Sequence, residues 1–252
     1  MTIGALVAPL PAILFDLDGV LTPTSQVHRR AWSALFTDYL AERGVTPPYT
    51  ERDYFRHIDG KPRYQGVHDL LASRGQSLPA GTPSDSPDTL TIAGLGNRKN
   101  SIFIRLLADD GVVPFPGTVS ILTELARAGK AMAVVSSSMN ARHVLASAGL
   151  SGFFEVVIDG QVAAAEHLRG KPAPDTFIRA AERLKAAPRD CAVVEDAVAG
   201  VAAGRAGGFA LVVGIDRGIG AAELTDAGAD VVVDGLPAMV AHGSLVAPRL
   251  AR

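Results

Sequence analysis

Two aspartates lie two positions apart at the end of a short apolar run near the start of the chain. Residues 12–15 are all apolar, Asp16 and Asp18 follow, and Gly19 stands directly after the second acid. Burying a carboxylate costs several kcal/mol, and two like charges at close range disfavour each other further. Proteins accept this cost where a cation and a reacting group share the site. The pair therefore predicts a metal-assisted catalytic site, with an Asp-rich turn after a strand as the simpler alternative.

Further polar side chains follow the other apolar runs of the chain. In an open parallel sheet the carboxyl ends of the strands share one edge, where ligands bind. Two unit charges ~4 Å apart interact by ~4 kcal/mol at an effective dielectric constant near 20, so several anions at this edge need cations beside them. A lysine and a divalent cation would supply them, and all-oxygen ligands favour Mg²⁺ over Zn²⁺. The residues expected to meet there are Asp16, Asp18, Ser136, Lys171, Glu195 and Asp196.

Four of these residues also have a plainer explanation when taken alone. Glu195 and Asp196 could cap a helix, Ser136 could be a turn residue, and Lys171 could be a solvated surface lysine. Their order along the chain, each after a different apolar run, favours one shared site over separate coincidences.

The elements that must position these residues are short, continuous apolar runs. Continuous rather than alternating runs indicate strands that are buried on both faces, as in parallel sheets. Segments with helical spacing separate them; one such stripe is Val119, Leu122, Leu125 and Ala126, closed by Gly129. Alternating strands and helices predict an α/β fold with a doubly wound, Rossmann-like parallel sheet. The predicted strands lie at 12–16, 131–135, 156–158, 192–194, 211–213 and 231–233.

The stretch from 25 to 112 has no comparable strands and is polar and helical in pattern. We therefore expect an α/β core formed by residues 1–24 and 113–252, with an inserted α-helical cap domain at 25–112. Residues 77–91 are rich in Pro, Ser and Gly and predict an exposed loop within the insert. The tail from about Ala241 is expected to be peripheral.

Composition excludes several classes of function. The formal net charge is −2, with five Lys, nineteen Arg and no basic cluster, so neither nucleic acid nor an anionic membrane is an expected partner. The single cysteine, Cys191, cannot form an internal disulfide, which fits a reducing compartment. Pro9 and Pro11 interrupt a mildly apolar N-terminus without a basic leader, and no run approaches the ~20 residues of a membrane span. We expect a cytoplasmic, monomeric protein.

With these motifs in order, the chain resembles the haloacid dehalogenase (HAD) superfamily of phosphotransferases. Asp16-Leu17-Asp18-Gly19-Val20 resembles its first motif, Ser136 its second, Lys171 its third and Glu195-Asp196 its fourth. The resemblance spans nearly the whole chain and includes the helical cap inserted between the first and second motifs.

The cap is more closely similar to the β-phosphoglucomutase-like branch of that superfamily. His28 and Trp32 have the spacing of a cap histidine and tryptophan, the Gly60-Lys61-Pro62-Arg63 segment resembles a phosphate-binding cap loop, and Lys99 lies in a segment that faces the site. One position departs from the branch, because Met139 stands where the mutase has a lysine. The residues that the resemblance assigns to substrate phosphate are Arg63, Lys99, Ser137, Ser138 and Asn140.

The resemblance implies catalysis through an aspartyl-phosphate on Asp16, with Asp18 as general acid and base and with His28, Ser136 and Lys171 in support. Mg²⁺ would be held by Asp16, Asp18 and Asp196, with Glu195 binding directly or through water. The implied reaction interconverts β-glucose 1-phosphate and glucose 6-phosphate, with glucose 1,6-bisphosphate as activator.

Other functions remain open from the residues alone. The principal alternative is a sugar-phosphate phosphatase of the same fold, and a non-catalytic binding protein is the alternative from another class. A dehalogenase would need neither the second acid at Asp18 nor the Glu195-Asp196 pair. A receiver domain would have no place for the cap.

Overall fold

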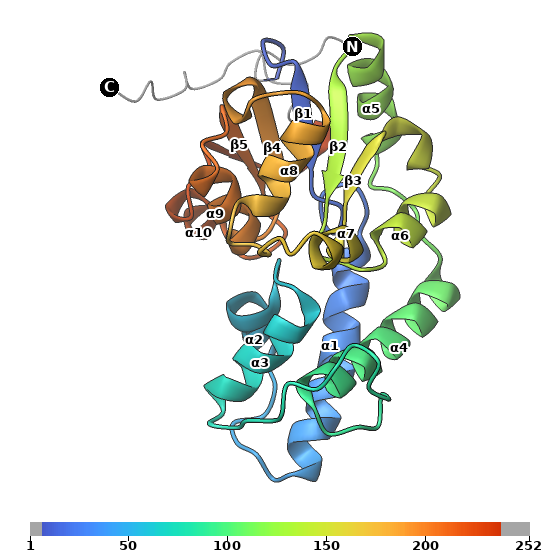
Figure 1. Ribbon diagram of the computed structural model, residues 1–252, viewed down its shortest axis with the longest axis vertical. Helices are drawn as coiled ribbons and strands as arrows, with labels where there is room; N and C mark the ends of the chain where they lie inside the picture. The colour runs from blue at the N-terminus through green and yellow to red at the C-terminus, as the bar shows by residue number, and fades with distance from the viewer. Residues whose placement is uncertain (1–6, 238–252) are drawn as a thin grey trace. The chain divides into compact units, whose positions relative to one another are not determined.

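The computed structural model describes residues 7–237, so the tail expected to be peripheral, from about Ala241, lies outside the described residues. The chain divides into two compact units (Figure 1). One is the contiguous stretch Thr24–Val112, and the other combines the residues up to Pro23 with those from Val113 onward. None of the helices in the described part of the chain is both long and apolar enough to cross a bilayer.

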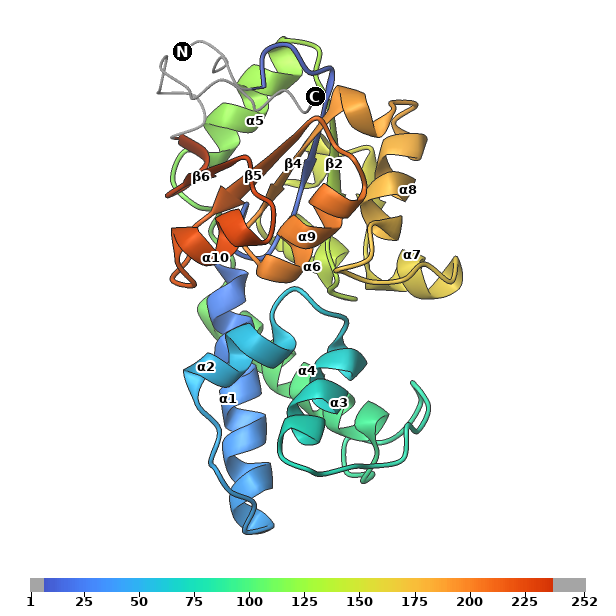
Figure 2. The same ribbon diagram turned by 90° about the vertical axis from the view of Figure 1, so that its left-hand side faces the viewer.

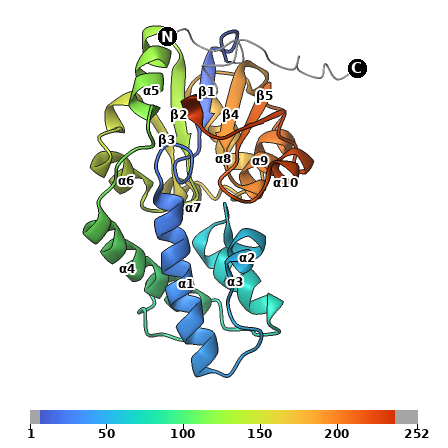
Figure 3. The same ribbon diagram turned by 180° about the vertical axis from the view of Figure 1, so that it is seen from behind.

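The discontinuous unit is built on a six-stranded sheet in which every neighbouring pair is parallel. The strand order is β3-β2-β1-β4-β5-β6, so the first strand of the chain lies in the middle, between β2 and β4 (Figures 1 and 3). The predicted α/β fold with a doubly wound parallel sheet is confirmed. The strands are β1 (Ala12–Phe15), β2 (Ala131–Val135), β3 (Val156–Ile158), β4 (Cys191–Glu195), β5 (Leu211–Ile215) and β6 (Val231–Val233).

Continuous burial explains why these runs form central strands. All four residues of β1 and all five of β4 and β5 are buried, as expected for strands covered by helices on both faces. Helices α5 and α8 lie on opposite sides of the sheet in Figure 2. The helices of this unit are α5 (Thr118–Arg127), α6 (Ala141–Ser147), α7 (Gly160–Ala165), α8 (Asp175–Arg183), α9 (Val198–Ala206) and α10 (Ala221–Asp226), with 3₁₀ turns η2 (Ser151–Phe153) and η3 (Pro188–Asp190).

The apolar stripe expected for α5 is confirmed at two of its four positions. Val119 is 50% exposed, and the buried face consists of Thr118, Ile121, Leu122 and Leu125. Those positions follow the i, i+3, i+4, i+7 spacing from Thr118, whose hydroxyl donates to the Leu21 carbonyl at 3.3 Å. The prediction was therefore right for Leu122 and Leu125 and wrong for Val119 and Ala126, which are exposed. At the start of the helix a polar residue with a buried hydrogen bond takes the place expected for the valine.

All regular elements of the contiguous unit are helices. Helix α1 packs along α4, and an aromatic core forms between the helices, with the Trp32 and Phe36 rings stacked at 5.5 Å. Residues 76–91 contain no helix or strand. Thr91 ends this loop, and its hydroxyl accepts a hydrogen bond from Gly94 N at 2.9 Å and caps α4. The elements are α1 (Thr24–Glu42), α2 (Glu51–Asp53), the π-helix η1 (Tyr54–Ile58), α3 (Arg63–Ser73) and α4 (Ile92–Asp110).

Candidate active site

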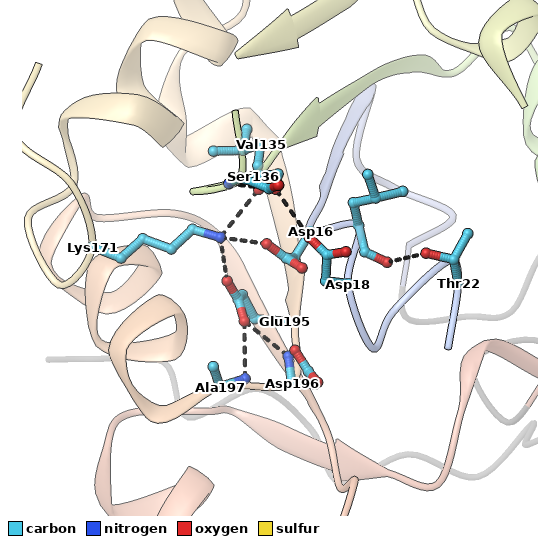
Figure 4. A network of polar contacts seen from close by, with 11 residues as sticks. Asp16, Asp18, Thr22, Val135, Ser136, Lys171, Glu195, Asp196 and Ala197 are labelled. Carbon is cyan, nitrogen blue, oxygen red and sulfur yellow. Dashed lines mark hydrogen bonds and ion pairs between the residues drawn. The ribbon is translucent and has the colours of Figure 1, made fainter. Parts of the chain in front are cut away.

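Three neighbouring strands end in polar side chains at one edge of the sheet. Phe15 pairs with Val134 on one side and with Val194 on the other, so the residues that follow β1 and β2 and the last residue of β4 lie close together. Figure 4 shows the resulting network, in which Lys171 contacts Asp16, Glu195 and the Val135 carbonyl, and Ser136 contacts Asp18. The parallel register therefore accounts for the convergence expected from the sequence.

Lys171 is the centre of this network. Its ammonium group donates to Asp16 Oδ1 at 2.6 Å, to Glu195 Oε1 at 2.5 Å and to the main-chain carbonyl of Val135 at 3.1 Å. The lysine is only 3% exposed. Burial alone would lower the pKa of Lys171, but the carboxylates of Asp16 and Glu195 raise it by more. The net shift of the pKa is therefore upward, and the ammonium form is favoured.

Asp16 lies in the opposite electrostatic situation. Burial raises the pKa of this carboxyl well above its usual range; Lys171 opposes the rise, and the neighbouring carboxylates of Glu195 and Asp18 add to it. One lysine thus faces several acids, and the edge of the sheet carries an excess of negative charge. A further cation beside Asp16 would favour its ionised form.

Glu195 has both carboxylate oxygens in use. Oε1 accepts from Lys171, and Oε2 accepts from the main-chain amides of Asp196 and Ala197, each at 2.9 Å. A Cβ atom at Gly200 would lie 1.8 Å from Oε1, so glycine is required for this carboxylate to fit beside α9. These contacts fit Glu195 for holding Lys171 and the turn after β4, and they favour Asp196 over Glu195 as a direct metal ligand.

The turns after β1 and β4 approach each other at Gly19. This residue has φ = +100°, and a Cβ atom there would lie 1.8 Å from Asp196 Oδ2. Its amide donates to the Thr22 carbonyl at 2.7 Å, which closes the turn that carries Asp18. Only glycine allows both the backbone conformation and the approach of the Asp196 carboxylate.

The loop after β2 carries the predicted serines. Ser136 is 3% exposed; its hydroxyl donates to Asp18 Oδ2 at 3.2 Å and accepts from Ser138 N at 3.0 Å. Ser138 Oγ accepts from Asn140 N at 3.2 Å, so the loop curls tightly, with Ser137 inside it, before α6 begins. Gly160 N donates to the Ser138 carbonyl at 3.1 Å and braces the loop from the start of α7.

The donor set fits a magnesium ion better than a softer metal. Asp16, Asp18 and Asp196 offer only oxygen atoms, and the Gly19 turn brings the Asp196 carboxylate against the loop that carries the other two. No group of three or more His, Cys, Asp or Glu side chains suited to one metal ion occurs within residues 7–237. Mg²⁺ typically binds one or two carboxylates and keeps several waters, so the residues present suit it.

The predicted residues of the contiguous unit form two small clusters. Lys99 is 3% exposed, makes a hydrogen bond with His28 Nδ1, and lies 5.0 Å from the Trp32 ring centroid. The imidazole of His28 stacks on Phe103 at 4.0 Å.

Arg63 begins α3 and donates to Asn100 Oδ1 at 2.8 Å, and burial lowers its pKa. Helix α4 therefore contributes to both clusters, through Lys99 and through Asn100. His28 and Arg63 therefore contact residues of α4, and Lys99 belongs to that helix.

One residue of the core edge escaped the sequence analysis. Arg217 follows β5, and its Nε donates to the Gly19 carbonyl at 2.7 Å. The same rule that singled out the residues after the other strands would have reached it, because Asp216 and Arg217 follow the apolar run at 211–213.

Comparison with known proteins identifies the family of the chain. A model described as a haloacid dehalogenase-like hydrolase matches residues 10–208. A curated protein of Mycobacterium bovis named β-phosphoglucomutase is 50% identical over 234 residues, covering 89% of each chain. Hexitol phosphatase A of Escherichia coli is 30% identical, covering 77% of this chain and 78% of that protein. A crystal structure of β-phosphoglucomutase from Clostridium difficile is 26% identical with a TM-score of 0.70, over 90% of this chain and 91% of the other.

Proposed function

Because the chain belongs to the haloacid dehalogenase-like hydrolase family, we propose that it is a Mg²⁺-dependent phosphotransferase acting on sugar phosphates, and specifically a β-phosphoglucomutase. The observation that carries this proposal is the pairing of two acids with different partners. Asp16 is ion-paired with buried Lys171, whereas Asp18 accepts from Ser136. The first suits a nucleophile and the second a proton carrier.

In this mechanism a carboxylate oxygen of Asp16 attacks phosphorus in line, and the bond from phosphorus to the leaving sugar oxygen breaks. Asp18 gives its proton to that oxygen as it leaves. In the second half-reaction Asp18 takes the proton of an acceptor hydroxyl, which attacks the aspartyl-phosphate and frees Asp16. Lys171, Ser136 and the amides of the loop after β2 would stabilise the transferring oxygens.

The cation site would use the Asp16 carboxylate, the Asp18 main-chain carbonyl and Asp196. Mg²⁺ bound there would neutralise charge on the transferring phosphoryl group. Glu195 would act behind this shell, since Lys171 and two main-chain amides occupy its oxygens.

The contiguous unit would serve as the cap that selects the substrate. We assign Arg63 and Lys99 to the phosphate that is not being transferred, together with Ser137, Ser138 and Asn140 of the core. His28 would help to couple closure of the cap to the proton-transfer residue Asp18. The support for these roles is the resemblance of the segments and the charges buried near α4.

A phosphatase acting on sugar phosphates is the second candidate. Met139 favours a phosphatase. A mutase must hold a bisphosphate intermediate while that intermediate reorients, and Met139 stands where the mutase branch has a lysine. The similarity to a hexitol phosphatase is in the same direction. Water rather than a sugar hydroxyl would then receive the phosphoryl group.

The deciding assay supplies β-glucose 1-phosphate, Mg²⁺ and a trace of glucose 1,6-bisphosphate, and follows glucose 6-phosphate and free phosphate together. A mutase forms glucose 6-phosphate without matching phosphate release. Phosphate release without isomerisation would make the protein a phosphatase. Absence of both reactions with any sugar phosphate would remove the enzymatic proposal.

A further inference from the structure

Arg217 links three segments of the discontinuous unit that are remote in sequence. Its Nε donates to the Gly19 carbonyl at 2.7 Å, and its Nη1 donates to the Asp234 carbonyl at 2.9 Å. Its guanidinium carbon lies 4.0 Å from the centroid of the Phe115 ring. The guanidinium is therefore fixed by two hydrogen bonds in different directions and by one aromatic face, an arrangement that a planar fork of donors allows.

The contact with Gly19 matters because of what lies on the other side of this glycine. The Gly19 amide is already bound to the Thr22 carbonyl, so Arg217 fixes the remaining polar group of the same residue. The Cα of Gly19 lies so close to Asp196 that a Cβ atom would overlap Oδ2. The position of this turn therefore sets how near the acids after β1 come to the acid after β4.

Phe115 gives the bridge a second fixed point. Its amide donates to the Leu21 carbonyl at 3.0 Å, and Thr118 donates to the same carbonyl through its hydroxyl. The Phe115 residue is thus hydrogen-bonded to the end of the turn, at Leu21, while Arg217 is hydrogen-bonded to the middle of the same turn, at Gly19. Movement of the turn would have to break contacts at Gly19 and at Leu21 together.

We propose that Arg217 is a positioning residue for the cation site, which holds the Gly19 turn at the distance from Asp196 that allows both acid-bearing loops to bind one Mg²⁺ ion. This inference rests on the proposed function for the existence of that site. Arg217 touches neither the ion nor the substrate, and it acts through the turn.

The positive charge of Arg217 would weaken Mg²⁺ binding, whereas its positioning of the Gly19 turn would strengthen it. The carboxylate of Asp196 lies near enough to act on the pKa of Arg217, although burial is the larger influence and lowers it. A positive charge near a cation site weakens cation binding, so removing the charge alone would strengthen it. Substitutions at Arg217 can therefore distinguish a positioning role from a purely electrostatic one by the sign of the change.

The test measures Mg²⁺ binding to the purified full chain by titration calorimetry, without substrate. Arg217→Lys keeps the charge but loses the planar fork, and Arg217→Met loses both. We expect Arg217→Lys to raise the Kd for Mg²⁺ roughly tenfold, the scale of one hydrogen bond made by a charged group. Arg217→Met should raise the Kd by a smaller factor, because the loss of positive charge partly offsets the loss of positioning. Turnover should recover toward that of the wild type at saturating Mg²⁺, which a general loss of folded structure would not allow.

Arg205→Met is the matched control, because Arg205 lies on α9 of the same unit, is 63% exposed and pairs with Asp230. It should leave the Kd unchanged. Unchanged or tighter Mg²⁺ binding by both Arg217 variants, with thermal unfolding like that of the wild type, would overturn the positioning role while the cation site stands. A wild-type protein that binds no Mg²⁺ would overturn the cation site, and the inference with it.

Discussion

At the scale of single residues, the ammonium group of Lys171 separates two carboxylates that would otherwise be buried together. Its bonds to Asp16 and Glu195 account for both carboxylates, and all three side chains are at most 10% exposed. Removing one member of a buried ionic group leaves an uncompensated charge, which costs more than the net strength of the pair.

Lys171→Met should consequently lower the free energy of unfolding at pH 7 by roughly 3–5 kcal/mol. Burial already raises the pKa of Asp16, and loss of the lysine would raise it further. The folded variant then binds more protons than its unfolded state, so its deficit should grow with rising pH and shrink as the carboxyls protonate. Urea unfolding at several pH values measures this, and a deficit independent of pH would contradict the electrostatic explanation.

Asp16→Asn tests the nucleophile directly. An amide at this position cannot form the aspartyl-phosphate, so turnover should fall on the order of 10⁴-fold or more, as for nucleophiles elsewhere. The variant keeps a side chain of the same size, and its circular dichroism should match the wild type. Asp226→Asn, an exposed acid at the end of α10, should retain full activity. Substantial turnover by the Asp16 variant would remove the assignment.

At the scale of elements, the fold could be predicted because each central strand is a continuous apolar run followed by a polar residue. Residues 12–15 and 192–194 carry this signal in full, and both belong to strands buried throughout. The α5 stripe could be assigned only in part, since Val119 is as apolar as Ile121 and only packing shows which of them is covered.

Part of the candidate site could likewise be predicted from the sequence, and part could not. The acids, Ser136 and Lys171 follow strands and could be named from the sequence, and their catalytic roles stay predictions. The partners of Glu195 could not be foreseen, because they depend on main-chain amides in the following turn. Arg217 binds a carbonyl and a ring that are remote in sequence, and no local pattern encodes such contacts.

Within the contiguous unit, Asp53 joins the start of η1 to the end of α3. Its Oδ2 accepts from Arg74 Nη2 at 2.7 Å and from Thr50 N at 2.8 Å. Burial raises the pKa of Asp53, but these hydrogen bonds and the Arg74 charge lower it more, so the net direction is below 3.8. The ionised carboxylate therefore stabilises the fold above that pH, and the contribution is lost as pH falls through the lowered pKa.

Asp53→Asn should lower the free energy of unfolding by about 1.5–3 kcal/mol at pH 7, the range for hydrogen bonds to charged groups. The difference from the wild type should stay constant down to about pH 5 and narrow at lower pH. Chemical denaturation at pH 7 and pH 4 checks both statements. Asp38→Asn, an exposed acid on α1, should change the free energy little at either pH.

At the scale of the whole molecule, a ligand that binds only the folded state stabilises the entire fold. Mg²⁺ at 100 times its Kd should raise the free energy of unfolding by about 2.7 kcal/mol. Asp196→Asn should abolish most of this gain, and Asp226→Asn should preserve it. Thermal unfolding with Mg²⁺ and with a chelator measures the effect; a gain of equal size in the Asp196 variant would place the ion elsewhere.

The oligomeric state is also a property of the whole molecule, and we expect a monomer. Light scattering should give a mass near 26.2 kDa, and twice that mass would show a dimer.

The central position of β1 in the sheet has a consequence for folding during synthesis. Ala12 pairs with Ala131 and Cys191, and all of Thr24–Val112 lies between the first strand and its first partner. Contacts between distant residues form slowly, and contiguous domains tend to fold as they emerge from the ribosome. The strand that leads to Asp16 is thus synthesised first, but its neighbouring strands are synthesised only after the whole helical unit. Until then a nascent chain would expose an unpaired apolar strand, the kind of segment that chaperones protect.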